Sequence, residues 1–299
     1  MLNNVKNYKS YSIICIIVKT DIEPNIFSFY IIKKYCVMKK VLNRHNIEPC
    51  ILHLPGDGLK KFEQQIQYLK NKEFEVKNKS KLLFLTICTP NIESPLIYQL
   101  KKNNLTYVNL ADYIKDDILK FSTKWNWMYK HIALKRFLEK NKDIDEETVI
   151  LLLDARDIYL NNIDNIYNLF ITKYCDRILF CGSKSDYPNS IGEGDDYKKI
   201  NTVKSTFPVF LNAGGIIAKK WQIEKLVDKI LECNKTGYCD TYKLKKQLID
   251  DDQYICKVIQ QYVPKEFKHY ELIIDDMCDF FQVLCLNKLV DEQTHFTCT

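Results

Sequence analysis

Two aspartates follow directly on an apolar run in the segment Ile150–Asp157, whose sequence is ILLLDARD. The apolar residues are sufficient for a buried strand, which would carry Asp154 and Asp157 at its C-terminal end. Carboxylates in this position can present hard oxygen ligands to a divalent cation. A structural Asp-rich turn is the alternative, because Asp also satisfies backbone groups in turns. The segment alone leaves both interpretations open.

Further segments combine polar or small residues with the ends of apolar runs, as expected around a ligand site. They are Gly182–Pro188 after an apolar run, Phe210–Ala218 with two glycines between apolar strands, the string Asp250–Gln253 at the start of an amphipathic helix, and Leu272–Asp275 leading to Phe280–Gln282.

The elements that would position these residues alternate between strands and helices. We expect strands at Leu82–Ile87, Leu105–Leu110, Val149–Leu153 and Arg177–Cys181, and helices at Pro95–Lys101, Trp127–Lys140 and Ile163–Ile171. This alternation predicts an α/β fold with a mostly parallel central sheet and helices on both faces. Ligands bind such sheets outside the carboxyl ends of the strands, where Asp154 and Asp157 would lie.

Residues 1–78 are predicted to form a small α/β N-terminal unit, separate from residues 79–299. Its expected elements are strands at Tyr11–Val18 and Pro49–Leu54 and helices at Phe27–Leu42 and Leu59–Lys70, with Lys70–Lys81 as a polar linker. His45 and His53 are interpreted as surface or packing residues, because no carboxylate or thiol stands at ligand spacing from both. We assign no chemistry to this unit.

Charge and hydropathy argue against a nucleic-acid-binding protein and against a membrane-spanning one. The net charge of +6 comes from 44 basic and 38 acidic residues, which are interspersed. Because basic residues do not cluster with aromatics, we expect no nucleic-acid partner. The run Tyr11–Val18 is too short to span a membrane and has no small-residue cleavage site after it, so we expect a soluble protein without a membrane span.

The 12 cysteines are scattered and form no zinc-binding pattern. Most lie in or beside apolar runs, where a free thiol behaves as a small hydrophobe. Cys233 and Cys239 flank a glycine and could form a disulfide. The cysteine usage favours a reducing, cytoplasmic compartment over a secretory one.

Taken in order, the motifs resemble the glycosyltransferase domain of the procollagen lysyl hydroxylases and the related procollagen galactosyltransferases. That family has an apolar strand with D-x-x-D, then F-S-A-E and W-P, then L-N-S-G-G, then D-D-Q, and finally L-D and F-Q. This chain has LLLDARD, LFCGS followed by YP, FLNAGG, DDDQ, and IID followed by FFQ. The resemblance runs from Lys81 to Leu289, and the shared order is far more specific than any single motif.

The resemblance implies a GT-A fold, which is Rossmann-like, and a UDP-sugar as the donor substrate. It also implies Mn²⁺ or Mg²⁺ bound by Asp154 and Asp157, whose oxygens suit these ions. Lys130 falls where the family has a lysine near the nucleotide, and it could pair with phosphate or be a solvated helix lysine.

The resemblance further implies a set of residues around the nucleotide-sugar. Asn212 is expected in the cleft, with Gly214 and Gly215 permitting close approach of the backbone to the sugar, although a β-bulge would also explain the glycines. Asp251 and Asp252 are the candidates for sugar recognition and charge stabilisation, or else for helix capping. Thr86 and Gln253 complete the expected nucleotide-sugar contacts.

Several positions depart from the family. Arg156 replaces the aromatic residue that packs on uracil, and its guanidinium can also stack on a base. Tyr187 replaces the Trp before Pro, and Ser183 replaces a Glu in the cleft, so the acceptor need not be the family's. The last metal ligand of the family is a His in an H-x-N-G string, and His295, in a different context, is the only histidine nearby. We expect a cut-short chain, a differently completed metal shell or an impaired domain.

These observations predict a glycosyltransferase that moves glucose or galactose from a UDP-sugar to a hydroxyl acceptor. Hydroxylysine or galactosyl-hydroxylysine of a collagen-like protein is the leading acceptor. The alternatives are a catalytically weak nucleotide- or glycan-binding scaffold and a sugar-nucleotide hydrolase.

Overall fold

A mixed six-stranded sheet organises the described part of the chain, in the order β10-β6-β7-β4-β2-β3. The structure is a computed structural model and describes residues 47–54, 68–88, 94–115, 126–183, 210–263, 271–275 and 278–283. The strands of this sheet are β2 (Leu82–Ile87), β3 (Tyr107–Asn109), β4 (Val149–Asp154), β6 (Ile178–Ser183), β7 (Phe210–Lys219) and β10 (Leu272–Ile274). Among these described strands only β7 runs antiparallel to the others.

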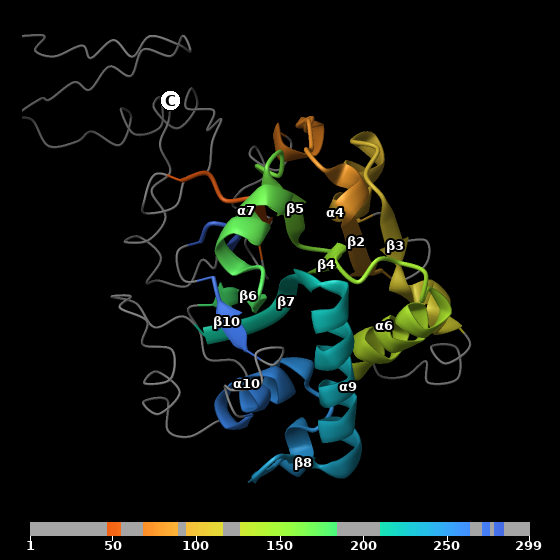
Figure 1. Cartoon of the computed structure of the whole chain (residues 1–299), viewed down its shortest axis with the longest axis vertical. Coiled ribbons are helices and arrows are strands. Elements are labelled where there is room, and N and C mark those ends of the chain that lie inside the picture. The colour runs from red at the N-terminus through yellow and green to blue at the C-terminus, as the bar shows by residue number, and fades with distance from the viewer. Residues whose placement is uncertain are drawn as a thin grey trace, which may run out of the picture.

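Helices cover both faces of the sheet, as predicted (Figure 1). They are α4 (Pro95–Lys102), α6 (Met128–Lys140), α7 (Ile166–Tyr174), α9 (Lys220–Thr236) and α10 (Asp252–Tyr262), with short 3-10 helices η1 (Lys79–Lys81), η2 (Leu110–Tyr113) and η3 (Lys246–Leu248). Alternate residues of β4 divide between the two layers: Ile150 and Leu152 pack with α6, α9 and α10, whereas Leu151 and Leu153 pack with α4 and α7. Both faces of β4 are covered by helices, and this explains why its apolar residues are continuous in sequence and do not alternate with polar ones.

A second, three-stranded sheet lies beside the end of β4. It contains β1 (Ile51–His53), β5 (Ile158–Leu160) and β11 (Phe281–Val283), in the order β11-β1-β5. Strand β1 pairs parallel with β11 and antiparallel with β5, so that His53 is opposite Ile158. This pairing brings β1 next to the segment that follows β4.

The predicted α/β class is confirmed, and most expected elements occur within a few residues of their predicted bounds. One interpretation was wrong: Phe210–Ala218 belongs to one continuous strand, β7, and not to two strands separated by glycines. The register opposite β6 shifts between Phe180 and Cys181, whose partners are Ile216 and Asn212. The glycines therefore lie at a bulge-like irregularity, which was the alternative considered for them.

Helix α9 and the hairpin formed by β8 (Tyr238–Cys239) and β9 (Tyr242–Lys243) were not predicted from the sequence. Helix α9 ends at Gly237, whose φ of 72° is the left-handed conformation that favours glycine at a helix C-terminus. Cys233 and Cys239, which could have formed a disulfide, are both buried free thiols.

The division at residue 78 stays a prediction. Residues 1–46 and 55–67 lie outside the described residues, and with them the expected elements Tyr11–Val18 and Phe27–Leu42 and most of the expected helix Leu59–Lys70. The described residues 47–54 pair with β5 and β11. In the segment predicted as a linker, the backbone N–H of Lys77 donates to the carbonyl of Asp164 at 2.8 Å. No helix in the described ranges is long and apolar enough to cross a membrane.

Candidate functional site

Hydrogen bonds from three elements fix the backbone around Asp154 and Asp157. The hydroxyl of Thr86 in β2 donates to the carbonyl of Leu153 at 2.8 Å. The hydroxyl of Ser94, the N-cap of α4, donates to the carbonyl of Ala155. The backbone N–H of Leu54 donates to the carbonyl of Asp157 at 2.8 Å. The segment bearing the two aspartates is therefore held in place at the carbonyl groups of three alternate residues, 153, 155 and 157.

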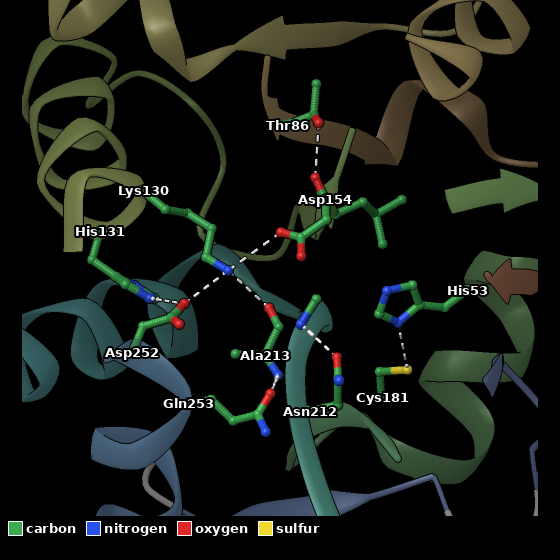
Figure 2. A network of polar contacts seen from close by, with 12 residues as sticks. His53, Thr86, Lys130, His131, Asp154, Cys181, Asn212, Ala213, Asp252 and Gln253 are labelled. Carbon is green, nitrogen blue, oxygen red and sulfur yellow. Dashed lines mark hydrogen bonds and ion pairs between the residues drawn. The ribbon is translucent and has the colours of Figure 1, made fainter. Parts of the chain in front are cut away.

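Lys130 links the end of β4 to two other segments of the site. Figure 2 shows its side chain extending from α6 toward Asp154, Asp252 and Ala213. Its ammonium lies 2.8 Å from Oδ2 of Asp252 and 3.4 Å from Oδ1 of Asp154, and it donates to the carbonyl of Ala213 at 2.9 Å. Because Lys130 is only 4% exposed, it is not the solvated helix lysine that the sequence also permitted.

The charges of Lys130 and Asp252 stabilise each other. Burial favours the neutral amine of Lys130, but the adjacent carboxylates of Asp154 and Asp252 outweigh that effect and raise its pKa. Burial likewise favours the neutral acid of Asp252, but Lys130 and the hydrogen bond to His131 lower its pKa below the usual range. The site therefore contains a buried ion pair at neutral pH.

His131 contacts the same carboxylate oxygen of Asp252 as Lys130 does. Its Nε2 is 3.1 Å from Oδ2 of Asp252, and its ring is buried. Burial lowers the pKa of His131, and the hydrogen bond to Asp252 opposes that shift only in part. A neutral ring donates to the carboxylate through Nε2–H, so Nδ1 is the acceptor nitrogen. Within the described residues this Nδ1 has no hydrogen-bond partner.

The neighbouring aspartates Asp251 and Asp252 have different environments. Asp251 is the N-cap of α10, and its side chain accepts from the backbone N–H of Tyr254 at 2.9 Å. Burial raises the pKa of Asp251, and that hydrogen bond opposes the shift. The capping interpretation therefore applies to Asp251, while Asp252 points into the polar network with Lys130.

The start of β7 is held from both sides where it faces the aspartates. The backbone N–H of Ala213 donates to the side-chain oxygen of Gln253 at 3.3 Å, while its carbonyl accepts from Lys130. Oδ1 of Asn212 accepts from the backbone N–H of Gly214 at 2.8 Å. Asn212 and Gln253, which are far apart in the sequence, thus bind neighbouring peptide groups of β7 (Figure 2).

The two glycines of β7 are required for different reasons. A Cβ on Gly214 would lie 2.8 Å from Cε1 of His53, 2.9 Å from Oδ1 of Asn212 and 3.0 Å from Oδ2 of Asp154. A Cβ on Gly215 would instead lie 2.7 Å from the ring of Phe281. Gly214 therefore leaves space between polar side chains of the site, whereas Gly215 permits packing in the core.

His53 contacts the second aspartate. Its Nε2 is 3.2 Å from Oδ2 of Asp157, and its Nδ1 is 4.0 Å from Sγ of Cys181. Burial would raise the pKa of Asp157, but the hydrogen bond and charge of His53 outweigh burial and lower it. His53 is buried as a packing residue would be, yet its ring reaches a predicted metal ligand.

The structure brings most of the predicted site residues together. Lys130, Asp154, Asp252, Asn212 and Gln253 belong to one network of polar contacts that includes Ala213. Arg156 is exposed between the aspartates, while Tyr187 and His295 lie outside the described residues.

Three contributors were not identified from the sequence. His53 was interpreted as a surface or packing residue because no carboxylate or thiol stands at ligand spacing from both His45 and His53, and its partner Asp157 lies 104 positions away in sequence. His131 carries no motif of its own, although it follows Lys130 directly. Ser94 had a recognisable signal, since a serine immediately before a proline is typical of a helix N-terminus.

The donor set fits a hard divalent cation. Asp154 and Asp157 supply carboxylate oxygens, and Gly214 leaves a space bordered by Oδ2 of Asp154 and Oδ1 of Asn212. In the described part of the chain, no group of three or more His, Cys, Asp or Glu side chains is placed so that it could hold a metal ion. Further ligands would therefore have to come from a bound substrate and water.

No protein-family model matches this chain, and no curated protein matches it.

Proposed function

We propose that this protein is a divalent-metal-dependent glycosyltransferase that moves glucose or galactose from a UDP-sugar to a hydroxyl acceptor. The observation that carries the proposal is the placement of Asp154 and Asp157 at the carboxyl end of β4, beside Asn212 and Gly214. Ligands of α/β sheets bind at this edge. Hydroxylysine or its galactosyl derivative in a collagen-like protein remains the leading acceptor, on the strength of the motif resemblance.

A GT-A fold is part of the same proposal. It is supported by a sheet whose strands, apart from β7, run in one direction and by helices on both faces. It is also supported by the position of the D-x-x-D motif at the end of β4, followed by β7 returning antiparallel with the FLNAGG motif at the same edge.

In the proposed reaction, Asp154 and Asp157 would hold Mn²⁺ or Mg²⁺ together with the diphosphate of the donor. When bound, the cation supplies charge neutralisation for the leaving diphosphate. Lys130 offsets the mutual repulsion of Asp154 and Asp252 and fixes the orientation of both. This role replaces direct phosphate pairing, since its ammonium already contacts two carboxylates and a carbonyl.

Asp252 would act on the sugar through its charge. Its carboxylate is ionised at neutral pH, and a fixed negative charge stabilises the positive charge that develops on the anomeric carbon. Asn212 and Gln253 would shape the sugar pocket by holding the peptide groups of Ala213 and Gly214. Asp251 contributes by starting the helix that carries Asp252.

One observation favours a second candidate function, a nucleotide- or glycan-binding scaffold with little turnover. Asp252 is only 5% exposed and contacts both Lys130 and His131. A carboxylate engaged in this way serves the stability of the site without contacting a sugar. The scaffold would bind UDP in a metal-dependent way but would not break the sugar–phosphate bond.

A donor screen distinguishes these functions. UDP release from several UDP-sugars is measured with Mn²⁺, with and without a galactosyl-hydroxylysine acceptor. The proposal expects hexose to appear on the acceptor, with little turnover in Asp157→Ala. UDP binding without turnover would identify the scaffold, and UDP-sugar breakdown with no labelled acceptor would identify a hydrolase.

A further inference from the structure

Both side chains that contact the Asp252 carboxylate contact the same one of its oxygens. Nζ of Lys130 lies 2.8 Å from Oδ2, and Nε2 of His131 lies 3.1 Å from that same atom. Figure 2 shows both dashed lines ending on one oxygen of Asp252, while its other oxygen has none. Because a carboxylate oxygen has two lone pairs, these two donors saturate Oδ2.

The second oxygen of Asp252, Oδ1, is open. Within the described residues Oδ1 has no hydrogen-bond or ion-pair partner. The buried side-chain atoms that lack a partner in this part of the chain belong to His131, Asn161 and Gln261. Since Oδ1 is not among them, it keeps contact with solvent. The small exposed fraction of Asp252, 5%, therefore includes an acceptor that a ligand can reach.

The two donors to Oδ2 come from consecutive residues of α6. Consecutive side chains of a helix leave its axis about 100° apart, so Lys130 and His131 approach the carboxylate from different directions. A single hydrogen bond would let the carboxylate rotate about its Cβ–Cγ bond, whereas two donors from different directions fix its plane. All three side chains are at most 7% exposed, so water does not compete for Oδ2.

Of the two donors, His131 is the one dedicated to Asp252. The ammonium of Lys130 is divided among Asp252, Asp154 and the carbonyl of Ala213, which together use its three N–H groups. Within the described residues, the hydrogen bond of the His131 ring goes to Asp252 alone. A change at His131 therefore acts on the Asp252 carboxylate without removing a contact of Asp154.

The imidazole of His131 is placed to hold Asp252 and not to react. Nε2 has to carry a hydrogen in order to donate to the carboxylate, which leaves Nδ1 of the neutral ring as an acceptor. Nδ1 is buried and has no partner among the described residues, so a hydrogen on it would be a buried donor left unpaired. Neither ring nitrogen is open to a substrate, which makes proton transfer by His131 unfavourable.

We propose that His131 is a positioning residue: together with Lys130 it occupies Oδ2 of Asp252 and keeps Oδ1 open to a hydroxyl of the bound hexose. This inference rests on the proposed function and gives the two oxygens of Asp252 separate tasks. It also reconciles the burial of Asp252 with a role on the sugar, because the contacts that hold the residue use only one oxygen. A group at Oδ1 has to donate a hydrogen, as a sugar hydroxyl does.

Nitrogen NMR tests the hydrogen bond of His131 without any ligand. The full chain is labelled with ¹⁵N-histidine, and the ring nitrogens are recorded at pH 7. The signals of His131, one of five histidines, are those lost in His131→Gln. We expect a neutral ring with its hydrogen on Nε2. A ring without a hydrogen on Nε2 could not donate to Asp252 and would overturn the proposal.

Two variants separate the positioning of Asp252 from general support of the fold. His131→Leu removes the donor, whereas His131→Gln carries an N–H near the place of Nε2. Calorimetry with Mn²⁺ measures the affinity of each variant for UDP-glucose, UDP-galactose and UDP. His131→Leu should bind the preferred UDP-hexose about tenfold more weakly, the size of one hydrogen bond to a charged group, and should bind UDP as the wild type does. His131→Gln should recover most of the lost affinity.

The possible results bear differently on the two proposals. Unchanged UDP-hexose affinity in His131→Leu, or an equal loss for UDP and UDP-hexose, would overturn the positioning role and leave the proposed function standing. Failure of His131→Gln to recover affinity at a wild-type melting temperature would also overturn it. A wild-type chain that has the Nε2–H ring but binds no UDP-hexose would remove the proposed function and the sugar contact of Oδ1, while the hold of His131 on Asp252 would stand.

Discussion

Lys130 and Asp252 form a buried ion pair in which the ammonium lies 2.8 Å from Oδ2 of the carboxylate, and neither side chain is more than 7% exposed. The pair connects α6 to the first turn of α10. Removing one charge from a buried pair leaves the other uncompensated, which is more unfavourable than the loss of an exposed salt bridge. A residue selected from the sequence as catalytic therefore also supports the architecture of the site.

Asp252→Asn should lower the free energy of unfolding by about 3 kcal/mol, because Lys130 would lose its closest countercharge. Urea denaturation measures the change. Asp251→Asn is the matched control, since asparagine also caps helices, and it should change stability by only a few tenths of a kcal/mol. Equal stability of Asp252→Asn and the wild type would show that the pair contributes nothing to the fold.

The contribution of Asp252 should disappear in acid. Its pKa is lowered in the folded protein, so its stabilising effect is fully present above the unfolded pKa of about 3.9 and is lost as the pH falls through the folded value. The stability difference between the wild type and Asp252→Asn should therefore be constant from pH 7 to about pH 5 and shrink below about pH 4. Urea titrations across this range test the expectation, and a difference that grows in acid would contradict it.

Alanine substitutions at the two glycines of β7 should have different effects. Gly215→Ala places a methyl group against the ring of Phe281 and should destabilise the fold by about 1–3 kcal/mol. Gly214→Ala meets the ends of the His53, Asn212 and Asp154 side chains, so we expect weaker UDP binding in the presence of Mn²⁺ with a smaller loss of stability. Calorimetry and thermal melting of both variants separate the effects. Normal UDP affinity in Gly214→Ala would exclude a ligand from this space.

Ser94→Ala should disturb the segment that contains the aspartates, although residue 94 lies far from it in sequence. The substitution removes the N-cap of α4 and leaves the buried carbonyl of Ala155 without its donor. The two losses together should reduce stability by about 2 kcal/mol. Metal-dependent UDP binding should weaken in parallel. Ser94→Thr retains a hydroxyl and serves as the control that should recover most of both properties.

The layers of the fold could be predicted because their signals are local. The apolar runs of β2 and β4 and the Ser94–Pro95 start of α4 can each be recognised within a few residues. Helix α9 also has a local signal, since the buried residues Ile223, Leu226, Val227 and Ile230 recur at helical spacing.

The candidate site was predictable only in part. The carboxylates at the end of β4 follow from the sequence pattern, but the contact between His53 and Asp157 depends on how β1 pairs with β5. The separate roles of Asp251 and Asp252 likewise depend on the position of α6. Lys130 and His131, both on α6, contact Asp252, whereas Asp251 caps α10. Such contacts between distant segments have no signature in a single sequence.

The central claim is that Asp154 and Asp157 bind a nucleotide diphosphate through a divalent cation. Isothermal titration calorimetry of UDP, with Mn²⁺ and with a chelator, tests it most directly in the wild type and in Asp157→Ala. The account predicts binding that is at least about tenfold tighter with Mn²⁺ in the wild type and insensitive to Mn²⁺ in the variant. Equal UDP affinity with and without Mn²⁺ in the wild type, or undiminished Mn²⁺ dependence in Asp157→Ala, would contradict it.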